Sequence, residues 1–497
     1  MAGQDVQLLI TALAGVVLLV LLIISKPRVH PFLALLVVSI LVGIASGMNL
    51  DGIAGAVTKG AGDTLGDVGI VLALGAMLGK ILADSGATER IATAIVERAS
   101  LQMLPWAMAG AAFLIGIPMF FEVGLVMLLP LIFSVARKVE QRGETKHGSP
   151  YLLVGVPAIA ALATLHGMVP PHPGPLTAIA ALKAEVGPTM LYGLVAAVPA
   201  VIIGGPLYAR FLAPRLSGVR PDDALLAQYT TAPLDAGRER VAVVHGSGST
   251  GVSGAAAPPA SARVASTSIR TVPAPPVGLG VLVVLFPALL MLLRTVVELL
   301  LPEAGWLLQF TTFLGEPTIA MLIGVLVALI VLGYTRGANA EKLRKSLGAS
   351  LAPISGVMLI IAGGGAFKQV LIDAGVGEAI TQFSQQLALP ALVLGWLISM
   401  LLSVSTGSAT VGIVGAAGLL APLAAADPGL NLPLLAIAIG AGSLFFNYAN
   451  HAGFWLVKES FGMSIGEATA VNSVVQSIVS LVGLMMALLL NLLPPMS

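Results

Sequence analysis

The stretch TLHGMVPPHPGPLT, at residues 164–177, decides the fold because it brings two histidines and four prolines into an apolar run. Three other apolar runs contain comparable breaks, which read GIPMFFEVG (116–124), SVSTGSATVG (403–412) and FFNYANHAGFW (445–455). Glycine and proline interrupt helices, so each of the four stretches predicts an unwound segment between two helices.

The composition around these breaks is that of a polytopic membrane protein. Of 497 residues, 57% are hydrophobic and 10% are charged, and the mean hydropathy is +0.98. Soluble domains are about one quarter charged. The composition therefore excludes a soluble enzyme and a disordered chain, and a net charge of +1 excludes a nucleic-acid binder. We expect an all-α membrane protein.

Hydrocarbon cannot satisfy the free N–H and C=O groups of an unwound segment. Such a segment must be buried in protein or must line a wet cavity. The four breaks therefore predict an internal site at mid-membrane. No catalytic motif accompanies them, and a chain without cysteine has no thiolate metal site. We expect neither an enzyme nor a bound cofactor or metal.

Two longer apolar regions, 105–136 and 388–425, are interrupted near their middles. Arginines in 84–100 and a strongly basic 137–148 place both flanks of the first region on one side of the membrane. We therefore expect each region to enter and return as a re-entrant hairpin. The alternative is a pair of short full spans.

The positions of Lys and Arg give an orientation. They collect in four segments that we place in the cytoplasm, at 26–30, 137–148, 210–276 and 336–347. The segments 49–63 and 302–316 contain one basic residue, Lys59, and belong outside. The N-terminus has no basic region before its first apolar run, 7–25, which we therefore expect to be a retained helix and not a signal peptide. Both termini are then outside.

A central loop divides the chain into two halves. Residues 212–276 are rich in Gly, Ser, Ala and Pro, which is typical of a flexible linker. It separates a first repeat, 1–211, from a second, 277–497.

The two halves resemble each other in sequence. ADSGATERI (83–91) matches IDAGVGEAI (372–380), and HPGPL (172–176) matches HAGFW (451–455). Because basic segments of one half fall opposite acidic segments of the other, the repeats are predicted to be inverted. Each repeat then has about five transmembrane helices plus one hairpin, with unwound helices at mid-membrane. Inverted repeats are typical of secondary transporters, whose substrate site lies where they meet.

The breaks contain the candidate site residues. Glu122 lies in an apolar run, where a carboxylate costs roughly 2.5–3.5 kcal/mol, and it suits a group that takes up and releases a proton. The alternative is a structural hydrogen bond. His166, His172 and His451 are three of six histidines. Histidine changes its charge near neutral pH, but it can also serve only as a donor to a freed carbonyl.

Two polar clusters add hydroxyl and amide groups that suit a polyhydroxylated substrate. The first contains Thr406, Ser408 and Thr410, and the second contains Asn447 and Asn450. Their alternative role is helix capping and packing. Asp84 and Asp373 each follow an apolar span. Both are candidates for proton coupling, although a position at a helix end is the more common role.

At the breaks the sequence resembles the gluconate permease (GntP) family, within the wider ion-transporter superfamily. The resemblance is carried by HGMVPPHPGPLTA (166–178), GGGAFKQVLIDAGVGEAI (363–380), TGSATVG (406–412) and FNYANHAGFWLVKESFGM (446–463). The block GDTLGDVGIVLALGAMLGKILADSGATERIA (62–92) is similar to the family's first conserved block. The long central loop departs from the family pattern.

The resemblance implies a symporter of the bacterial inner membrane that takes up gluconate or a related sugar acid with protons. It also implies a homodimer in which a transport domain moves against a scaffold like an elevator. The substrate site then falls in 117–124, 166–177, 404–411 and 446–454. The residues expected to bind substrate are Phe121, Glu122, Gly124, His166, His172, Gly174, Thr406, Ser408, Thr410, Asn447, Asn450 and His451.

Other functions remain open on the sequence. Within the same class, the substrate is D-serine or another small hydroxy acid, or the coupling ion is sodium. In a different class, re-entrant hairpins also form the selectivity filters of channels. In every case the expected partners are a small solute, an ion and the lipid bilayer.

Overall fold

The computed structural model describes residues 3–494 except 27, 98, 143–147, 223–225, 227–273, 302, 304 and 377–388. Most of the predicted linker, 212–276, therefore lies outside the described residues. The part that is described is helical throughout, and nine of its helices are long and apolar enough to cross a membrane. This confirms an all-α multi-pass membrane protein.

Eleven α-helices and two π-helical turns make up the first half of the described chain. They are α1 (Gly3–Ile24), α2 (Pro31–Ala45), α3 (Leu50–Thr64), η1 (Leu65–Gly69), α4 (Ile70–Asp84), α5 (Ala87–Val96), α6 (Leu104–Gly116), α7 (Phe121–Gln141), α8 (Pro150–Met168), α9 (Pro173–Leu182), α10 (Val186–Ile202), η3 (Ile203–Leu207) and α11 (Tyr208–Leu212).

The described part of the second half is also helical. Its elements are α13 (Val277–Leu300), α14 (Trp306–Leu314), α15 (Pro317–Ala328), η5 (Leu329–Gly333), η6 (Tyr334–Arg336), α16 (Ala340–Leu351), η7 (Ala352–Ile354), α17 (Ser355–Asp373), α19 (Ala391–Thr406), α20 (Ala409–Ala426), α21 (Leu432–Gly442), α22 (Ala452–Phe461), α23 (Ile465–Ala468), η8 (Thr469–Ser473) and α24 (Val474–Leu490).

The same local structure recurs where the two halves match in sequence. Asp84 ends α4, and its counterpart Asp373 ends α17. Gly86 and Gly375 follow with φ angles of 76° and 75°, a left-handed conformation that glycine adopts at little cost. The matched residues beyond 376 lie outside the described part of the chain.

Two segments between the apolar runs are helical as well. Asn49 caps α3 by accepting a hydrogen bond from the N–H of Gly52 at 2.5 Å. Asn339 caps α16 by accepting from the N–H of Lys342 at 2.8 Å. Helix α3 continues through η1 into α4, so residues 50–84 form one long helical element. An asparagine cap explains why each helix begins at that point.

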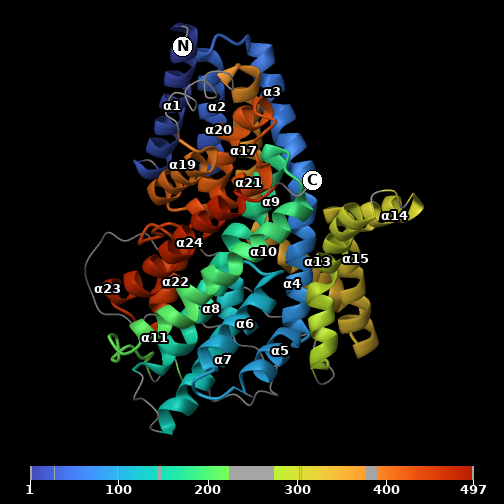
Figure 1. Cartoon of the computed structure of the whole chain (residues 1–497), viewed down its shortest axis with the longest axis vertical. Coiled ribbons are helices and arrows are strands. Elements are labelled where there is room, and N and C mark those ends of the chain that lie inside the picture. Colours follow the sequence, from blue (N-terminus) through green and yellow to red (C-terminus); the bar gives the residue numbers. More distant parts are fainter. Residues whose placement is uncertain are drawn as a thin grey trace.

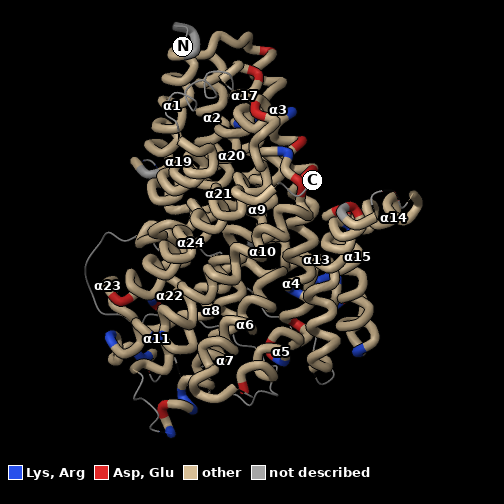
Figure 2. Tube along the Cα trace, viewed as in Figure 1, with Lys and Arg blue, Asp and Glu red and all other residues tan. Residues whose placement is uncertain are grey.

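The molecule is elongated, with α1, α2 and α17 at one end and α5, α7 and α11 at the other (Figure 1). Helices α13, α14 and α15 lie along one side. Lys, Arg, Asp and Glu gather toward the two ends and the α3 edge, and the centre is almost free of them (Figure 2). This distribution is expected of a chain whose middle is surrounded by hydrocarbon.

Helix α8 is the central element of the fold. The apolar window of Pro150–Leu182 is 94% buried, whereas that of α1 is 17% buried. Helices α6, α7, α10, α21 and α24 all pack against α8. The longest break in the first half therefore lies inside protein and not at the lipid surface.

Contact between α8 and α21 depends on glycine. A β-carbon at Gly440 would lie 1.8 Å from the carbonyl oxygen of Gly167. No side chain larger than hydrogen fits at that distance, so the two backbones touch directly. Small residues allow this close approach in membrane helices.

Gly440→Ala is expected to force α21 away from α8 and to destabilise the protein by about 1–3 kcal/mol, the usual cost of overpacking. The measurement is the thermal unfolding midpoint of the detergent-purified protein. Gly110→Ala on α6 is the control, because a β-carbon there meets no atom within 4 Å. Equal midpoints for the two variants would contradict this account of the contact.

Candidate functional site

All four predicted breaks separate two helices. Helix α6 ends at Gly116 and α7 begins at Phe121, and α8 ends at Met168 before α9 begins at Pro173. In the second half, α19 is followed by α20 after Gly407 and Ser408, and α21 by α22 after 443–451. Gly407 has a φ of +70°, which a residue with a side chain adopts only under strain.

The breaks contact one another and form a closed ring. His172 Nε2 lies 2.9 Å from the carbonyl oxygen of Gly116, which joins the second break to the first. Gly174 joins the second break to the start of α20, which follows the third break, because a β-carbon there would lie 2.5 Å from Ile413 Cδ1.

The fourth break completes this ring. A β-carbon at Gly407 would lie 2.4 Å from the carbonyl oxygen of Asn450. A β-carbon at Gly453 would lie 3.1 Å from Phe121 Cε1. The helices that begin at the breaks, α7, α9, α20 and α22, therefore start close together. Helix N-termini present free N–H groups and favour anions.

The predicted histidines and Glu122 lie around this meeting point. The rings of His166 and His172 are 6.1 Å apart, centre to centre. His166 interacts electrostatically with Glu122, and His451 with His166. His166 Nδ1 is buried and has no hydrogen-bond partner among the described residues. The structure thus brings together groups from three of the four breaks.

Glu122 differs from its sequence-based expectation. The sequence predicts a carboxylate buried in an apolar run, but the side chain is exposed. It occupies the first turn of α7, and its Oε1 atom lies 3.9 Å from the position of a β-carbon at Gly453.

The fourth break is held by a buried polar network. Asn447 Nδ2 donates to Gln476 Oε1 at 2.7 Å, and Gln476 Nε2 donates to Asn472 Oδ1 at 2.9 Å. The carbonyl oxygen of Asn447 accepts from Asn472 Nδ2 at 3.1 Å and from Ser473 Oγ at 2.7 Å. These bonds occupy backbone and amide groups that the end of α21 would otherwise leave unpaired.

Ser403, near the end of α19, links this network to the third break. Its Oγ donates to the carbonyl oxygen of Ser443 at 2.6 Å and lies 3.4 Å from His451 Nε2. Ser403, Asn472 and Gln476 were not among the predicted site residues. Asn472 and Gln476 are polar residues inside the last apolar run, and this was the signal that the sequence offered.

Other predicted residues make local bonds. Thr406 Oγ1 donates to the carbonyl oxygen of Leu402 at 2.7 Å, and Ser408 Oγ caps α20 by accepting from the N–H of Val411 at 3.3 Å. Asn450 Nδ2 donates to the carbonyl oxygen of Val404 at 2.7 Å. Thr410 is half-buried, and Gly124 packs against Leu162.

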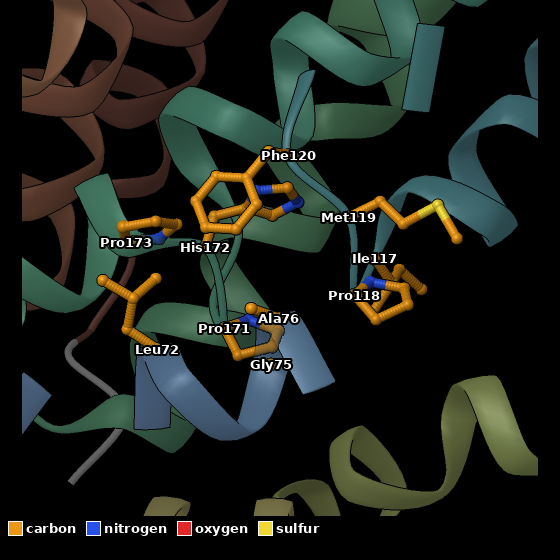
Figure 3. A pocket seen from close by; sticks show the side chains of 10 residues that line it. All are labelled: Leu72, Gly75, Ala76, Ile117, Pro118, Met119, Phe120, Pro171, His172 and Pro173. Carbon is orange, nitrogen blue, oxygen red and sulfur yellow. The ribbon is translucent and has the colours of Figure 1, made fainter. Parts of the chain in front are cut away.

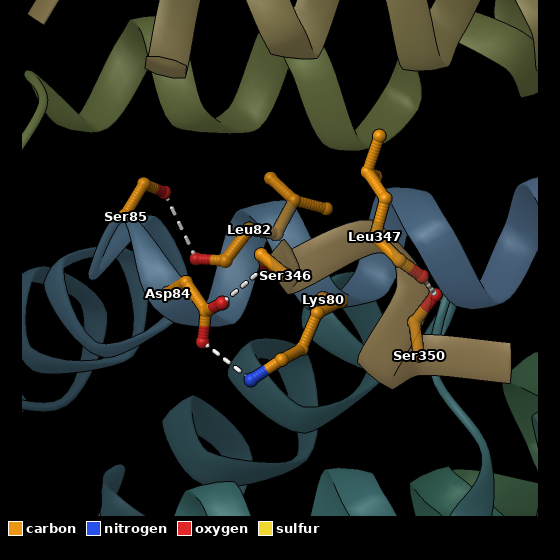
Figure 4. A network of polar contacts seen from close by, with 7 residues as sticks. All are labelled: Lys80, Leu82, Asp84, Ser85, Ser346, Leu347 and Ser350. Atoms are coloured by element: carbon orange, nitrogen blue, oxygen red, sulfur yellow. Dashed lines mark hydrogen bonds and ion pairs between the residues drawn. The ribbon is translucent and has the colours of Figure 1, made fainter. Parts of the chain in front are cut away.

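Asp84 and Asp373 bind partners outside the breaks. Asp84 is buried and accepts from Lys80 Nζ at 2.7 Å and from Ser346 Oγ at 2.5 Å, which ties α4 to α16 (Figure 4). Asp373 accepts from Gln369 Nε2 at 2.8 Å. The partners of both carboxylates lie on α4, α16 and α17. A helix-end role, the more common one for such residues, fits these contacts.

A small pocket adjoins the first two breaks (Figure 3). Its lining comes from α4, from the turn between α6 and α7, and from the Pro-rich turn after α8. The residues are Leu72, Gly75, Ala76, Ile117, Pro118, Met119, Phe120, Pro171, His172 and Pro173. Within the described ranges, no group of three His, Cys, Asp or Glu side chains could hold a metal ion.

Sequence comparison relates the chain to known proteins along its full length. The chain is 37% identical to the gluconate permease of Pseudomonas aeruginosa, with 99% of each chain covered. It is also 37% identical to the high-affinity gluconate transporter of Escherichia coli K12, over 97% of this chain and 99% of that one. The L-idonate transporter of the Gnt-II system of Escherichia coli K12 is 34% identical over the same shares.

Structural comparison relates it to a solved transporter. The crystal structure of the Alcanivorax borkumensis YdaH transporter matches with a TM-score of 0.62, covering 94% of this chain and 100% of that one at 15% identity. This similarity shows a shared fold.

The family match covers both halves. The sequence pattern of the GntP family permeases matches residues 7–232 and 253–493. It supports a transporter and not an enzyme. The chain belongs to the GntP family of permeases.

Proposed function

We propose that this protein is a secondary active transporter that takes up gluconate or a related sugar acid together with protons. The ring of four helix breaks is the observation that carries the proposal, because it gathers four helix N-termini inside the protein. The names of the relatives, gluconate permease and L-idonate transporter, support the substrate class.

The chemistry of the ring suits a polyhydroxylated carboxylate. The substrate carboxylate binds at the free N–H groups that begin α7, α20 and α22 and at the N–H of Gly174 in α9, because Pro173 and Pro175 have no N–H. The helix dipoles there favour a negative charge. Substrate hydroxyls bind Ser408, Thr410 and Asn450, whose side chains are only partly covered. His166 supplies a further donor or acceptor through the nitrogen that has no partner among the described residues.

Coupling to protons is assigned to Glu122. Its carboxylate is exposed beside the site and interacts electrostatically with His166. Protonation removes a negative charge next to an anionic substrate, so the loaded site crosses apolar surroundings at a lower cost. Asp84 is less suited to this role, because its ion pair with Lys80 holds it between α4 and α16.

The architecture that we propose has two inverted repeats, each with a re-entrant hairpin, formed by α6–α7 and by α19–α20. The repeated order of elements and the shared fold of the YdaH transporter support it. Elevator-like movement of the hairpins against a scaffold, in a homodimer of the bacterial inner membrane, rests on the family resemblance. The orientation with both termini outside rests on the positions of Lys and Arg.

Three other functions make different predictions. A D-serine or hydroxy-acid transporter with the same site would accumulate those solutes in place of gluconate. A sodium-coupled transporter would need sodium and ignore a pH gradient, and a channel would give flux that never runs uphill.

Labelled gluconate uptake into proteoliposomes separates these functions. With an inward proton gradient and no sodium, we expect uphill accumulation that a protonophore abolishes. Accumulation that needs sodium, or flux that only dissipates a gluconate gradient, would overturn the proposal. An L-idonate and D-serine competition panel then ranks the substrates.

Glu122→Gln is expected to abolish accumulation driven by a pH gradient while gluconate exchange continues, because the amide cannot take up a proton. The two assays are run on the same proteoliposomes. Glu316→Gln is the control, since Glu316 lies at the start of α15, where it accepts from the N–H of Ile319. Full accumulation by Glu122→Gln would assign coupling to another residue.

Gln476→Leu is expected to weaken gluconate binding about tenfold, because a buried amide left without its partner costs about 1–3 kcal/mol and loosens the break. Ser480→Ala, one turn further along α24, is the matched control. It removes the acceptor of the Trp396 Nε1–H bond and should lower stability without changing affinity. Equal affinity losses in both variants would show a general structural effect.

A further inference from the structure

The two halves carry nearly the same short sequence after each hairpin turn, with Leu125 in one and Ile413 in the other. Residues 123–126 read VGLV in α7, and residues 411–414 read VGIV in α20. The neighbouring helices correspond through Asp84 and Asp373, which makes Gly75 of α4 the counterpart of Gly364 of α17. Val126 and Val414 are then counterparts, and the two helix pairs can be compared residue by residue.

In the second half, the two helices are packed closely. A β-carbon at Gly364 would lie 1.6 Å from Val414 Cγ1, and Val414 is 2% exposed. Further along, a β-carbon at Gly418 would lie 3.5 Å from Lys368 Cβ. Helix α17 therefore lies directly on the body of α20.

In the first half, the corresponding surfaces are apart. A β-carbon at Gly75 would meet only Met321 Cε, at 3.5 Å, and Val126 is 43% exposed. Gly79, the counterpart of Lys368, faces the turn before α7, with its β-carbon position 3.1 Å from the carbonyl oxygen of Pro118. Helix α4 thus lies against the tip of the hairpin, and Gly75 lines the pocket beside it (Figure 3).

We propose that Gly75 and Val126 come into contact when the site opens to the other side of the membrane, which we call the opposite-facing state. They then pack as Gly364 and Val414 pack in the structure described here. This inference rests on the proposed function, in which inverted repeats exchange conformations during each transport cycle. Gly75 is then required for transport although it lies outside the ring of breaks.

The physical requirement is steric. The gap at Gly364 admits no β-carbon, because one would overlap Val414. The same gap at Gly75 must stay open for Val126, although the present state leaves room for a methyl group there. A methyl group at position 75 therefore blocks only the state that is not observed here.

Gly75→Ala tests this requirement. We expect the gluconate affinity to stay within about twofold of that of the unmodified protein, and the thermal unfolding midpoint to stay unchanged. The rate of uptake should fall about tenfold or more, which is the effect expected of an overpacked contact in the blocked state. Gly66→Ser is the matched control on the same helical element, because its counterpart is Ser355 and a β-carbon at 66 meets no atom within 4 Å. Normal uptake by Gly75→Ala would overturn the proposal.

Introduced cysteine pairs give a second test, and the natural chain has no cysteine to interfere. Lys368→Cys with Gly418→Cys places β-carbons 3.5 Å apart, which suits a disulfide. This pair should cross-link in the state seen here. The counterpart pair, Gly79→Cys with Pro130→Cys, should cross-link only in the opposite state. Either cross-link should stop uptake until it is reduced.

Mass spectrometry of oxidised membrane vesicles follows both cross-links, whatever the substrate is. Failure of the Gly79/Pro130 pair to cross-link, while the Lys368/Gly418 pair does, would overturn the proposal. Cross-linking of both pairs in a protein that does not accumulate gluconate would support the exchange and count against the proposed substrate or coupling. The single-cysteine variants control for effects of each substitution.

Discussion

Backbone groups without partners are the constraint on which this structure depends. Four helices are broken inside a protein whose surroundings are apolar, and each break exposes N–H and C=O groups that lipid cannot satisfy. Side chains supply the partners at several of these groups. Asn450 binds the carbonyl of Val404 and Ser403 binds that of Ser443, and His172 adds a second bond to the carbonyl of Gly116, which also accepts from the N–H of Met119. Each of these bonds also joins two breaks or the helices beside them, so satisfying the backbone brings the candidate site together.

The same sequence pattern leads to different contacts in the two halves. Lys80 and Gln369 occupy equivalent positions one turn before Asp84 and Asp373, and each donates to its aspartate. The first pair is a buried ion pair that also binds Ser346, whereas the Gln369–Asp373 bond is exposed. A buried ion pair is costly to separate. It holds α4 against α16, and the close packing at Gly364 holds α17 against α20 in the state described here.

The places where helices break were predictable, because proline, glycine and polar residues within an apolar run disfavour a continuous helix. The network around Asn447 was missed. Asn472 and Gln476 lie in a run whose average is apolar, and their role depends on a turn some 25 residues earlier in the chain. The exposure of Glu122 also escaped prediction, because it follows from how the turn before α7 meets α4 and α22. Contacts between distant segments decide such details, and a single sequence does not contain them.

Polar groups of the candidate site fall into two sets: those whose hydrogen bonds are already made within the protein, and those that still have an unused donor or acceptor or are exposed. Asn447 uses both atoms of its amide, through Gln476 and Ser403, and its carbonyl as well. It therefore holds the backbone in place and has little capacity for a ligand. Among the described residues, His166 Nδ1 has no hydrogen-bond partner, and the Glu122 side chain is exposed. A ligand or a proton gains most where a polar group still lacks its bond, so the proposed binding and coupling roles suit the second set, and the first set fixes the geometry of the breaks.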